Sequence, residues 1–200
     1  MKLFDSSASP FVRKINVLLH ELGQSEAVAR EPLATTAFNS AEALIAANPL
    51  GKIPALALDD GRVLYDSRVI SAYLNTHFGG PFYPDDDFQT QLLEATGDGI
   101  MDCTVSMAYE VRLRPEGERS AQWIEAQWAK AARTIKARDS DFIAQLRGPI
   151  TMGHISIGCA LGYVDFRHDA RGWRDIAPEL ADWFADFSSR PSMLMTQPRG

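Results

Sequence analysis

This sequence has little of what an export signal, a disulfide framework or a metal site would need. It holds two cysteines, Cys103 and Cys159, which lie far apart and match no metal or redox spacing. None of its four histidines has a metal-ligand partner at a suitable spacing, so we expect no metal. The first residues, Met1-Lys2-Leu3-Phe4-Asp5, lack the long apolar stretch of a signal peptide. We therefore expect a cytoplasmic protein, because few cysteines and no export signal fit a reducing compartment.

Long apolar runs and basic clusters are also missing. No apolar stretch reaches the ~20 residues that a membrane-spanning helix needs. The 200 residues carry 20 Lys and Arg against 26 Asp and Glu, a net charge of −6, and no basic run stands out. The sequence therefore predicts neither a membrane protein nor a nucleic-acid-binding protein.

The pattern of the chain changes once, at a Gly- and Pro-rich segment over residues 79–87 that reads as a linker. Before the linker, strands and helices alternate, which is the order βαβ, then α, then ββα of a thioredoxin-like domain. We expect strands at 2–4 and 28–31, a helix at 10–22 with Ser9 as its N-cap, a partly helical stretch at 33–47, a hairpin over 55–65 around an Asp-Gly turn, and a helix from 66 to 78.

After the linker the pattern is helical to the end. We expect helices over residues 88–113, 116–146, 155–166 and 176–187, followed by an irregular tail with Pro191 and Pro198. The helix at 155–166 is apolar nearly all round, which marks it as buried in a bundle. The sequence thus predicts an α/β domain at residues 1–79 and an all-helical domain at residues 88–200.

The most informative stretch is Asn48-Pro49-Leu50-Gly51-Lys52-Ile53-Pro54-Ala55-Leu56. Pro54 stands at the mouth of a strand, where a proline has no N–H to give to a ladder. A cis bond before it would leave the Ile53 N–H and C=O free to pair with an extended peptide. Asp66-Ser67 follow at the apparent start of a helix. The alternative is a plain turn, two hairpin strands and an ordinary helix cap.

Three runs in the first half resemble a cytosolic glutathione S-transferase, and the resemblance covers the whole chain. They are Ser9-Pro10-Phe11-Val12-Arg13-Lys14, Asn48-Pro49-Leu50-Gly51-Lys52-Ile53-Pro54 and Asp66-Ser67. In the helical half, residues 98–102 and 162–167 are similar to a bacterial branch, the YibF-like transferases. The Asn-Pro-x-Gly-Lys-Ile-Pro run joined to an acidic-Ser pair is specific, whereas the motifs of the helical half are weak.

The resemblance implies that glutathione binds as a co-substrate. The Ile53 backbone beside Pro54 would pair with the cysteinyl unit of glutathione by edge addition. The Ser67 hydroxyl and the N–H groups at that helix start would hold the γ-glutamyl carboxylate. Asp66 would face the γ-glutamyl ammonium, and Lys52 would lie near the glycine carboxylate. A plain N-cap remains the alternative for Asp66-Ser67.

Ser9 occupies the position where this family places a Ser, Cys or Tyr that faces the thiol. A hydroxyl there donates to the thiolate, and the positive end of the helix from Pro10 acts in the same place. Ser7 lies in the same loop and competes for this role, and Ser9 can also act simply as an N-cap. A Ser in place of Cys favours conjugation over thiol–disulfide exchange.

A second substrate, a small hydrophobic electrophile, is expected between the two domains. Met101, Tyr109 and Arg112 share one stripe of the long helix with Val105, and Tyr163 and Phe166 lie on the buried helix. Phe11 completes the expected pocket. A core stripe is the alternative for Met101 and Val105.

Two further features are left open. Asp98 and Asp102 form a like-charge pair at i, i+4, which would face a partner or a ligand ammonium or simply cost a little in the helix. The family usually starts its buried helix with a Ser/Thr-x-x-Asp capping box. Here Thr151 is followed by His154 in place of the acid, which we expect to weaken the cap.

The resemblance implies a homodimeric transferase that serves detoxification by joining the glutathione thiolate to electrophiles. Two alternatives stay open: a protein of this fold that binds glutathione or a partner protein without turnover, and a glutathione-dependent reductase or peroxidase.

Overall fold

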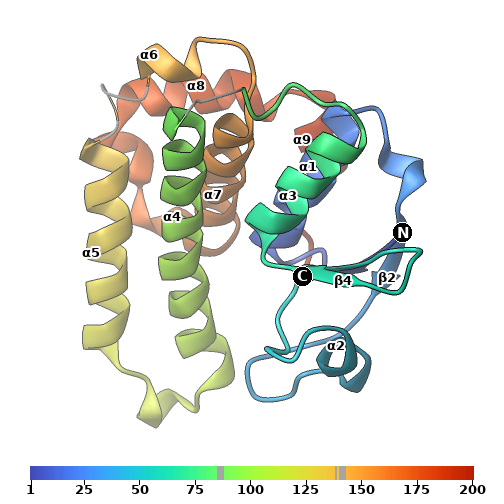
Figure 1. Cartoon of the computed structure of the whole chain (residues 1–200). Helices are drawn as coiled ribbons and strands as arrows, with labels where there is room; N and C mark the ends of the chain where they lie inside the picture. The colour runs from blue at the N-terminus through green and yellow to red at the C-terminus, as the bar shows by residue number, and fades with distance from the viewer. Residues whose placement is uncertain (85–87, 138, 140–142) are drawn as a thin grey trace. The chain divides into compact units, whose positions relative to one another are not determined.

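The computed structural model describes residues 1–84, 88–137, 139 and 143–200 and divides the chain into two compact units (Figure 1). The first unit is Met1–Asp86 together with Pro191–Gly200, and the second is Asp87–Arg190. The division expected from the sequence differs at the C-terminus, because residues 191–200 return to the first unit. Among the described residues, no helix combines the length and the apolar character that crossing a membrane requires.

The first unit is built on a four-stranded mixed sheet of order β2-β1-β3-β4, as the sequence predicts. β1 is parallel to β2 and antiparallel to β3, which is antiparallel to β4. Helices α1 and α3 cover one face of the sheet and α2 covers the other (Figure 1). The bounds are β1 Lys2–Asp5, α1 Pro10–Glu21, β2 Ala29–Pro32, α2 Glu42–Ala47, β3 Ala55–Ala57, β4 Val63–Tyr65, α3 Ser67–His77 and α9 Pro191–Met195, with a 3₁₀ turn at Ser25–Ala27.

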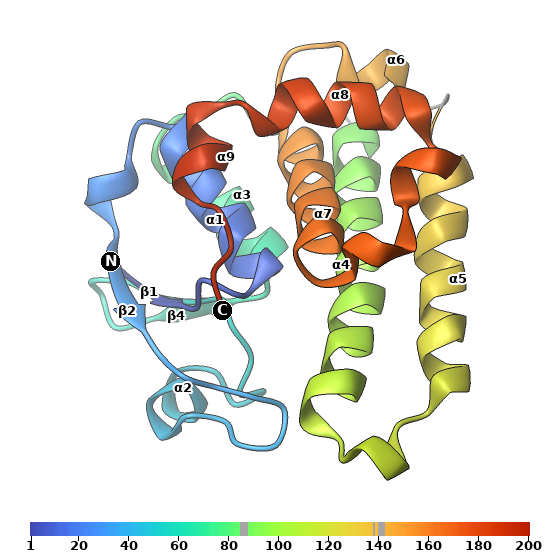
Figure 2. The ribbon, with the colours of Figure 1, turned by 180° about the vertical axis from the view of Figure 1, so that it is seen from behind.

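Helix α9 corrects the expectation of an irregular tail. Pro191 is its first residue, a position where the missing N–H of proline does no harm. The helix packs against α1, as both views of the ribbon show (Figures 1 and 2). The buried Arg13 of α1 donates to the Met193 carbonyl at 3.0 Å, and the Ser192 hydroxyl donates to Glu21 at 2.5 Å. These bonds attach the C-terminal segment to α1.

The second unit is all-helical, as expected, but one predicted helix is wrong. The sequence suggested one helix over residues 116–146, whereas the structure has α5 Ala121–Ala137 and α6 Ile143–Leu146. Asp139, between them, accepts the Leu180 N–H at 2.9 Å with its carboxylate, a capping role that Asp prefers to a helix interior. The other elements are α4 Phe88–Leu113, α7 Met152–His168 and α8 Pro178–Ser188, with 3₁₀ turns at Glu116–Glu118, Asp169–Arg171 and Trp173–Ile176.

The core of this unit is the contact between α4 and the buried helix α7, which lie side by side in Figure 2. Every residue from Met152 to Val164 is buried, which explains the apolar sequence of α7. Two glycines allow the helices to approach closely. A Cβ added at Gly97 would lie 2.4 Å from the Ser156 hydroxyl, and one at Gly153 would lie 2.5 Å from the Leu93 Cβ.

The start of α7 corrects the expectation of a weakened cap. The Thr151 N–H donates to His154 Nδ1 at 3.1 Å, so both bonds of a capping box are present with His in place of the acid. His154 is 4% exposed, and burial lowers the pKa of its imidazole. The neutral ring is therefore the form that this cap requires.

We expect acid to weaken the fold through His154. Because the pKa of His154 is lower in the folded than in the unfolded chain, its contribution is fully present above ~6.5, the unfolded value, and is lost as the pH falls through the folded value. Urea titrations from pH 7.5 downwards should show a smaller loss of unfolding free energy in His154→Gln, which keeps an acceptor but does not titrate. Parallel curves for the two proteins would contradict this assignment.

Candidate functional site

The register of the sheet brings three of the predicted site segments to one end of its strands. Phe4 of β1 pairs with Ala55 of β3, which pairs in turn with Tyr65 of β4. Because β3 runs antiparallel to both β1 and β4, the end of β1, the start of β3 and the end of β4 lie at the same end of the sheet. The loop with Ser9, the Ile53-Pro54 bond and the Asp66-Ser67 pair follow or precede those ends directly.

Ser9 is the N-cap of α1, as the sequence predicts. Its hydroxyl oxygen accepts the Val12 N–H at 3.3 Å, and Pro10 occupies the first helical position. An accepted bond leaves the hydroxyl hydrogen of Ser9 available, since a serine can donate and accept at the same time. Ser9 thus presents a donor beside the positive end of a 12-residue helix.

Ser7, the competing hydroxyl, is engaged elsewhere. Its Oγ donates to the Arg199 carbonyl at 3.1 Å, and its own carbonyl accepts the Arg199 N–H at 3.3 Å. This pair of bonds joins the loop to the C-terminal segment. The hydroxyl of Ser7 is therefore used within the protein, which favours Ser9 as the free donor.

A polar cavity of about 320 Å³ opens beside Ser9 in the same unit. Guanidinium groups outnumber carboxylates in its wall, where Asp5 lies within 3.8 Å of Arg30. A surplus of positive charge near a thiol favours its ionised form. The lining includes Asp5, Ser6, Ser9, Arg13, Arg30 and Arg199.

The Ile53-Pro54 peptide bond is cis, as the sequence analysis suggested. Among the described residues, the backbone N–H and C=O of Ile53 make no backbone hydrogen bond. The preceding turn is held by the buried Asn48, whose amide donates to the Lys52 carbonyl at 2.8 Å and accepts the Leu50 N–H at 3.0 Å. The Ile53 backbone is thus presented, unpaired, at the start of β3, with the exposed Lys52 next to it.

Asp66 and Ser67 begin α3 in an unusual backbone conformation. Asp66 has φ +69°, a value that side-chain-bearing residues rarely adopt, and its carboxylate accepts the Arg68 N–H at 2.9 Å. Ser67 is 5% exposed, and its carbonyl accepts the Ser71 hydroxyl at 2.7 Å. A strained residue at a helix start is a reason to look for a functional role.

The residues predicted to contact the second substrate do not all have access to one. Phe11 is half-buried on α1 of the first unit, and Tyr109 and Arg112 are exposed on α4 of the second. Met101 is fully buried and belongs to the core, which corrects its placement in the pocket and agrees with the alternative of a core stripe. Tyr163 is 5% exposed, and burial is the largest influence on the pKa of its phenol, which is raised.

The acidic pair of α4 is also explained in part within the chain. The Ser156 hydroxyl donates to the Asp98 carboxylate at 3.1 Å in the α4–α7 contact, and Asp98 is 7% exposed. Asp98 therefore supports the packing of this unit. Within the residues that the structure describes, no group of three or more His, Cys, Asp or Glu residues is arranged to hold a metal ion.

Two family models match this chain. Residues 8–77 match the glutathione S-transferase N-terminal domain, and residues 121–186 match the glutathione S-transferase C-terminal domain. An uncharacterized GST-like protein, YibF of Escherichia coli K12, is 30% identical over 99% of this chain and 98% of its own. The chain belongs to the glutathione S-transferase family.

Solved structures of this family show the same fold. A glutathione transferase family member from Pseudomonas fluorescens Pf-5, with bound glutathione, is 44% identical with a TM-score of 0.96, covering 100% of this chain and 99% of that one. In a second structure from that organism, which covers both chains fully at 43% identity and a TM-score of 0.91, the ligand is S-(propanoic acid)-glutathione. A Methylobacillus flagellatus glutathione S-transferase with glutathione bound is 32% identical, with a TM-score of 0.84 and 99% of each chain covered.

Sequence reasoning missed the part that the C-terminal segment plays at this site. The bonds from Arg199 to Ser7 and from Arg13 to Met193 connect residues more than 170 positions apart. No local pattern could have indicated them, because they depend on the chain returning to its first unit. The only available signal was Pro191, a residue suited to a helix start.

The backbone at Asp66 predicts an unequal response to two substitutions. Asp66→Ala removes the cap and keeps the strain of a positive φ that the wild type already carries, so we expect a loss of ~1 kcal/mol in unfolding free energy, the value of the cap. Asp66→Gly also removes the cap but relieves the strain, so its loss should stay under ~1 kcal/mol. Urea unfolding of both variants measures the difference, and equal losses would show that the conformation carries no strain.

Proposed function

We propose that this protein is a glutathione transferase that joins the glutathione thiolate to small electrophiles. The proposal rests on one observation: the Ser9 hydroxyl, the unpaired Ile53 backbone and the Asp66-Ser67 helix start lie at the same end of the sheet. Each of the three suits a different part of the tripeptide. The glutathione-bound relatives support glutathione as the co-substrate.

In this proposal, glutathione lies extended across this end of the sheet. Ile53 pairs with the cysteinyl unit through its N–H and C=O, in the manner of an added strand. Ser67 and the N–H groups of the α3 start hold the γ-glutamyl carboxylate, where the helix dipole favours negative charge. Asp66 faces the γ-glutamyl ammonium, and Lys52 lies near the glycine carboxylate.

Ser9 then stabilises the thiolate. Its hydroxyl donates to the sulfur while its oxygen keeps the bond from Val12, and the α1 dipole and nearby guanidinium groups act in the same direction. A free thiol has a pKa of ~8.5, and lowering it by ~2 units needs about 2.7 kcal/mol of differential stabilisation. The sulfur then attacks a small electrophile.

The chemistry of the sulfur separates this function from the reductase and peroxidase alternatives. Exchange between glutathione and a disulfide is favoured by a protein thiol at the site, and both cysteines of this chain lie in the helical unit. A thioether of glutathione, S-(propanoic acid)-glutathione, is bound in the Pseudomonas fluorescens relative, which supports a conjugate as product. We also propose a cytoplasmic detoxifying role, as the family resemblance implies.

Substitution of Ser9 tests the proposal directly. Ser9→Ala should leave the dissociation constant of glutathione nearly unchanged, raise the pKa of the bound thiol and slow conjugation at neutral pH. Thiolate absorbance of bound glutathione against pH measures that pKa without depending on turnover. Ser67→Ala should do the opposite: binding weakens, because a charge-assisted bond of roughly 1.5–3 kcal/mol is lost, and the thiol pKa stays.

Ser7→Ala serves as the matched control in the same loop. It removes the bond to Arg199 and should leave the thiol pKa unchanged. Superimposable absorbance curves for wild type and Ser9→Ala would exclude a chemical role for Ser9. Turnover of no electrophile by a glutathione-binding wild-type protein would favour the non-catalytic alternative.

We also propose that the protein is a homodimer, as the family resemblance implies. One chain has a mass of 22.1 kDa, so light scattering at micromolar concentration should give about twice that value. Because Asp98 is held inside the chain by Ser156, Asp98→Asn should not change the assembly. A particle with the mass of one chain would contradict the dimer.

A further inference from the structure

The polar cavity of about 320 Å³ in the first unit has more positive than negative charge in its wall. Arg13 lines it from α1, Arg30 from β2 and Arg199 from the segment after α9. Among the described residues of this wall, Asp5 supplies the single carboxylate. Every residue of the wall belongs to the first unit, so the cavity is complete within it.

Asp5 compensates the charge of Arg30. Asp5 Oδ2 lies 3.8 Å from Arg30 Nε, which donates to Asn16 Oδ1 at 2.7 Å. The Asn16 amide in turn donates to Asp5 Oδ2 at 3.4 Å. These three side chains satisfy one another, and the surplus positive charge of the wall therefore belongs to Arg13 and Arg199.

Arg13 is a buried cation whose partners are neutral. It is 7% exposed, and its guanidinium donates to the Met193 carbonyl at 3.0 Å and to the Thr196 hydroxyl at 3.5 Å. Those bonds use Nη2 and Nε, so Nη1 makes no hydrogen bond within the described residues. Nη1 is not among the buried atoms that lack a partner, so it keeps contact with open space, and Arg13 lines the cavity. Because a buried charge without a counter-charge costs free energy, Arg13 favours an anion there.

Arg199 offers a second guanidinium on a fixed backbone. Its N–H donates to the Ser7 carbonyl at 3.3 Å, and its carbonyl accepts the Ser7 hydroxyl at 3.1 Å. These bonds hold the main chain at the cavity, whereas the side chain forms no ion pair within the part of the chain that the structure describes. Its guanidinium is therefore available to a ligand.

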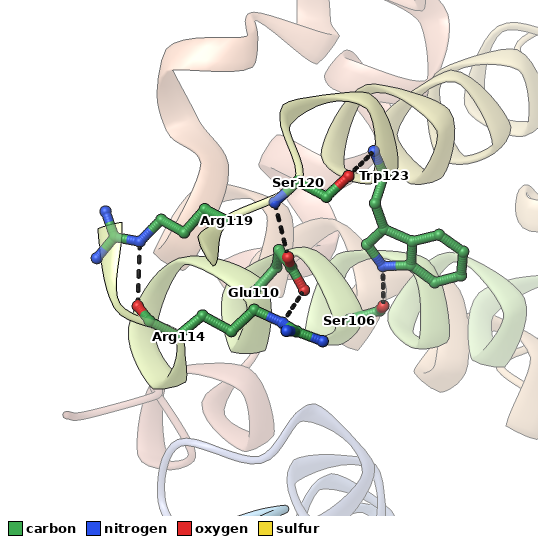
Figure 3. A network of polar contacts seen from close by, with 6 residues as sticks. All are labelled: Ser106, Glu110, Arg114, Arg119, Ser120 and Trp123. Carbon is green, nitrogen blue, oxygen red and sulfur yellow. Dashed lines mark hydrogen bonds and ion pairs between the residues drawn. The ribbon is translucent and has the colours of Figure 1, made fainter. Parts of the chain in front are cut away.

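Arginines elsewhere in the chain show the paired state for comparison. Arg62 Nε donates to Asp60 at 2.8 Å in the first unit. In the helical unit, Arg114 Nε donates to Glu110 at 2.9 Å, in the network that Figure 3 shows between the end of α4 and the start of α5. The protein itself neutralises such groups, which it does not do for the two arginines of the cavity.

We propose that this cavity binds a phosphate group, as the free ion or as the monoester of a small metabolite, between Arg13 and Arg199. Guanidinium groups bind phosphate oxygens through paired N–H donors. Ser6 and Gln197 also line the cavity and add a hydroxyl and an amide donor. Such a ligand is distinct from glutathione, and its binding does not require transferase activity.

Charge and size favour phosphate over a carboxylate. Two guanidinium groups without acidic partners match the two negative charges that a phosphate monoester carries above its second pKa of ~6, whereas a carboxylate has one. A volume of about 320 Å³ lies at the lower end of the range for small-ligand sites, ~300–1,000 Å³, and leaves room for an organic group on the phosphate. The bound anion would join α1 to the C-terminal segment, because its two arginines come from these two parts of the chain.

Calorimetry with inorganic phosphate tests the site on the complete protein. At pH 8 and constant ionic strength, wild type should bind phosphate at least ~10-fold more tightly than acetate, which has a single charge. Glycerol 3-phosphate then separates the two sources of the group. Tighter binding of the ester assigns the rest of the cavity to its organic part, and equal binding assigns the free ion.

Substitutions of the two arginines locate the anion. Arg13→Gln should raise the dissociation constant of phosphate by ~10- to 100-fold, the usual effect of losing a charge-assisted hydrogen bond. Arg13 also holds Met193, so circular dichroism must first show that this variant is folded. Arg199→Gln keeps the backbone bonds to Ser7 and should raise the constant ~3- to 5-fold, as expected for an exposed charge. Arg62→Gln removes the same charge from a paired site and should change nothing.

Saturation with glutathione completes the test. Phosphate should bind the glutathione-loaded protein with nearly the same dissociation constant, because neither arginine is among the proposed glutathione contacts. Loss of phosphate binding in the presence of glutathione would show that the anion occupies the glutathione site and would overturn the proposal. Undetectable phosphate binding, equal affinities for phosphate and acetate, or a phosphate constant that neither arginine substitution changes would overturn it as well.

Discussion

The antiparallel ladder that joins β1, β3 and β4 is the constraint on which the candidate site depends. Its register places Phe4, Ala55 and Tyr65 in one row, so the chain leaves β1, enters β3 and leaves β4 at the same end of the sheet. A slip of one residue would turn every side chain of a strand to the other face of the sheet. The buried face with Phe4 and Leu44 therefore also keeps Ser9, Ile53 and Ser67 in their common place.

The loop at this edge is held from two sides. On one side, Ser9 caps α1, whose buried face packs on the sheet. On the other, the C-terminal segment exchanges two hydrogen bonds with Ser7 and accepts one from Arg13, which is only 7% exposed. A buried guanidinium without its acceptors would be strongly destabilising, so this attachment belongs to the stability of the first unit.

Charge pairing inside the helical unit occupies several of its carboxylates. Glu110 and Asp165 are saturated by Arg114, Arg174 and neighbouring N–H groups, and Asp98 is held by Ser156. The sequence shows all these charges but does not show which of them pair. Residues two positions apart lie on opposite sides of a helix, so neighbours in the sequence can have different partners.

The sequence by itself determined the fold class, the helix starts at Ser9 and Asp66, the unpaired strand entry at Ile53 and the buried helix α7, because caps, prolines and apolar periodicity act over a few residues. Only the tertiary structure decided that α5 ends at Ala137 and α6 begins at Ile143, that Met101 lies in the core, and that the chain end returns to Ser7 and Arg13. Those outcomes depend on contacts between residues far apart in the chain, such as Asp139 with Leu180, and no local pattern contains them.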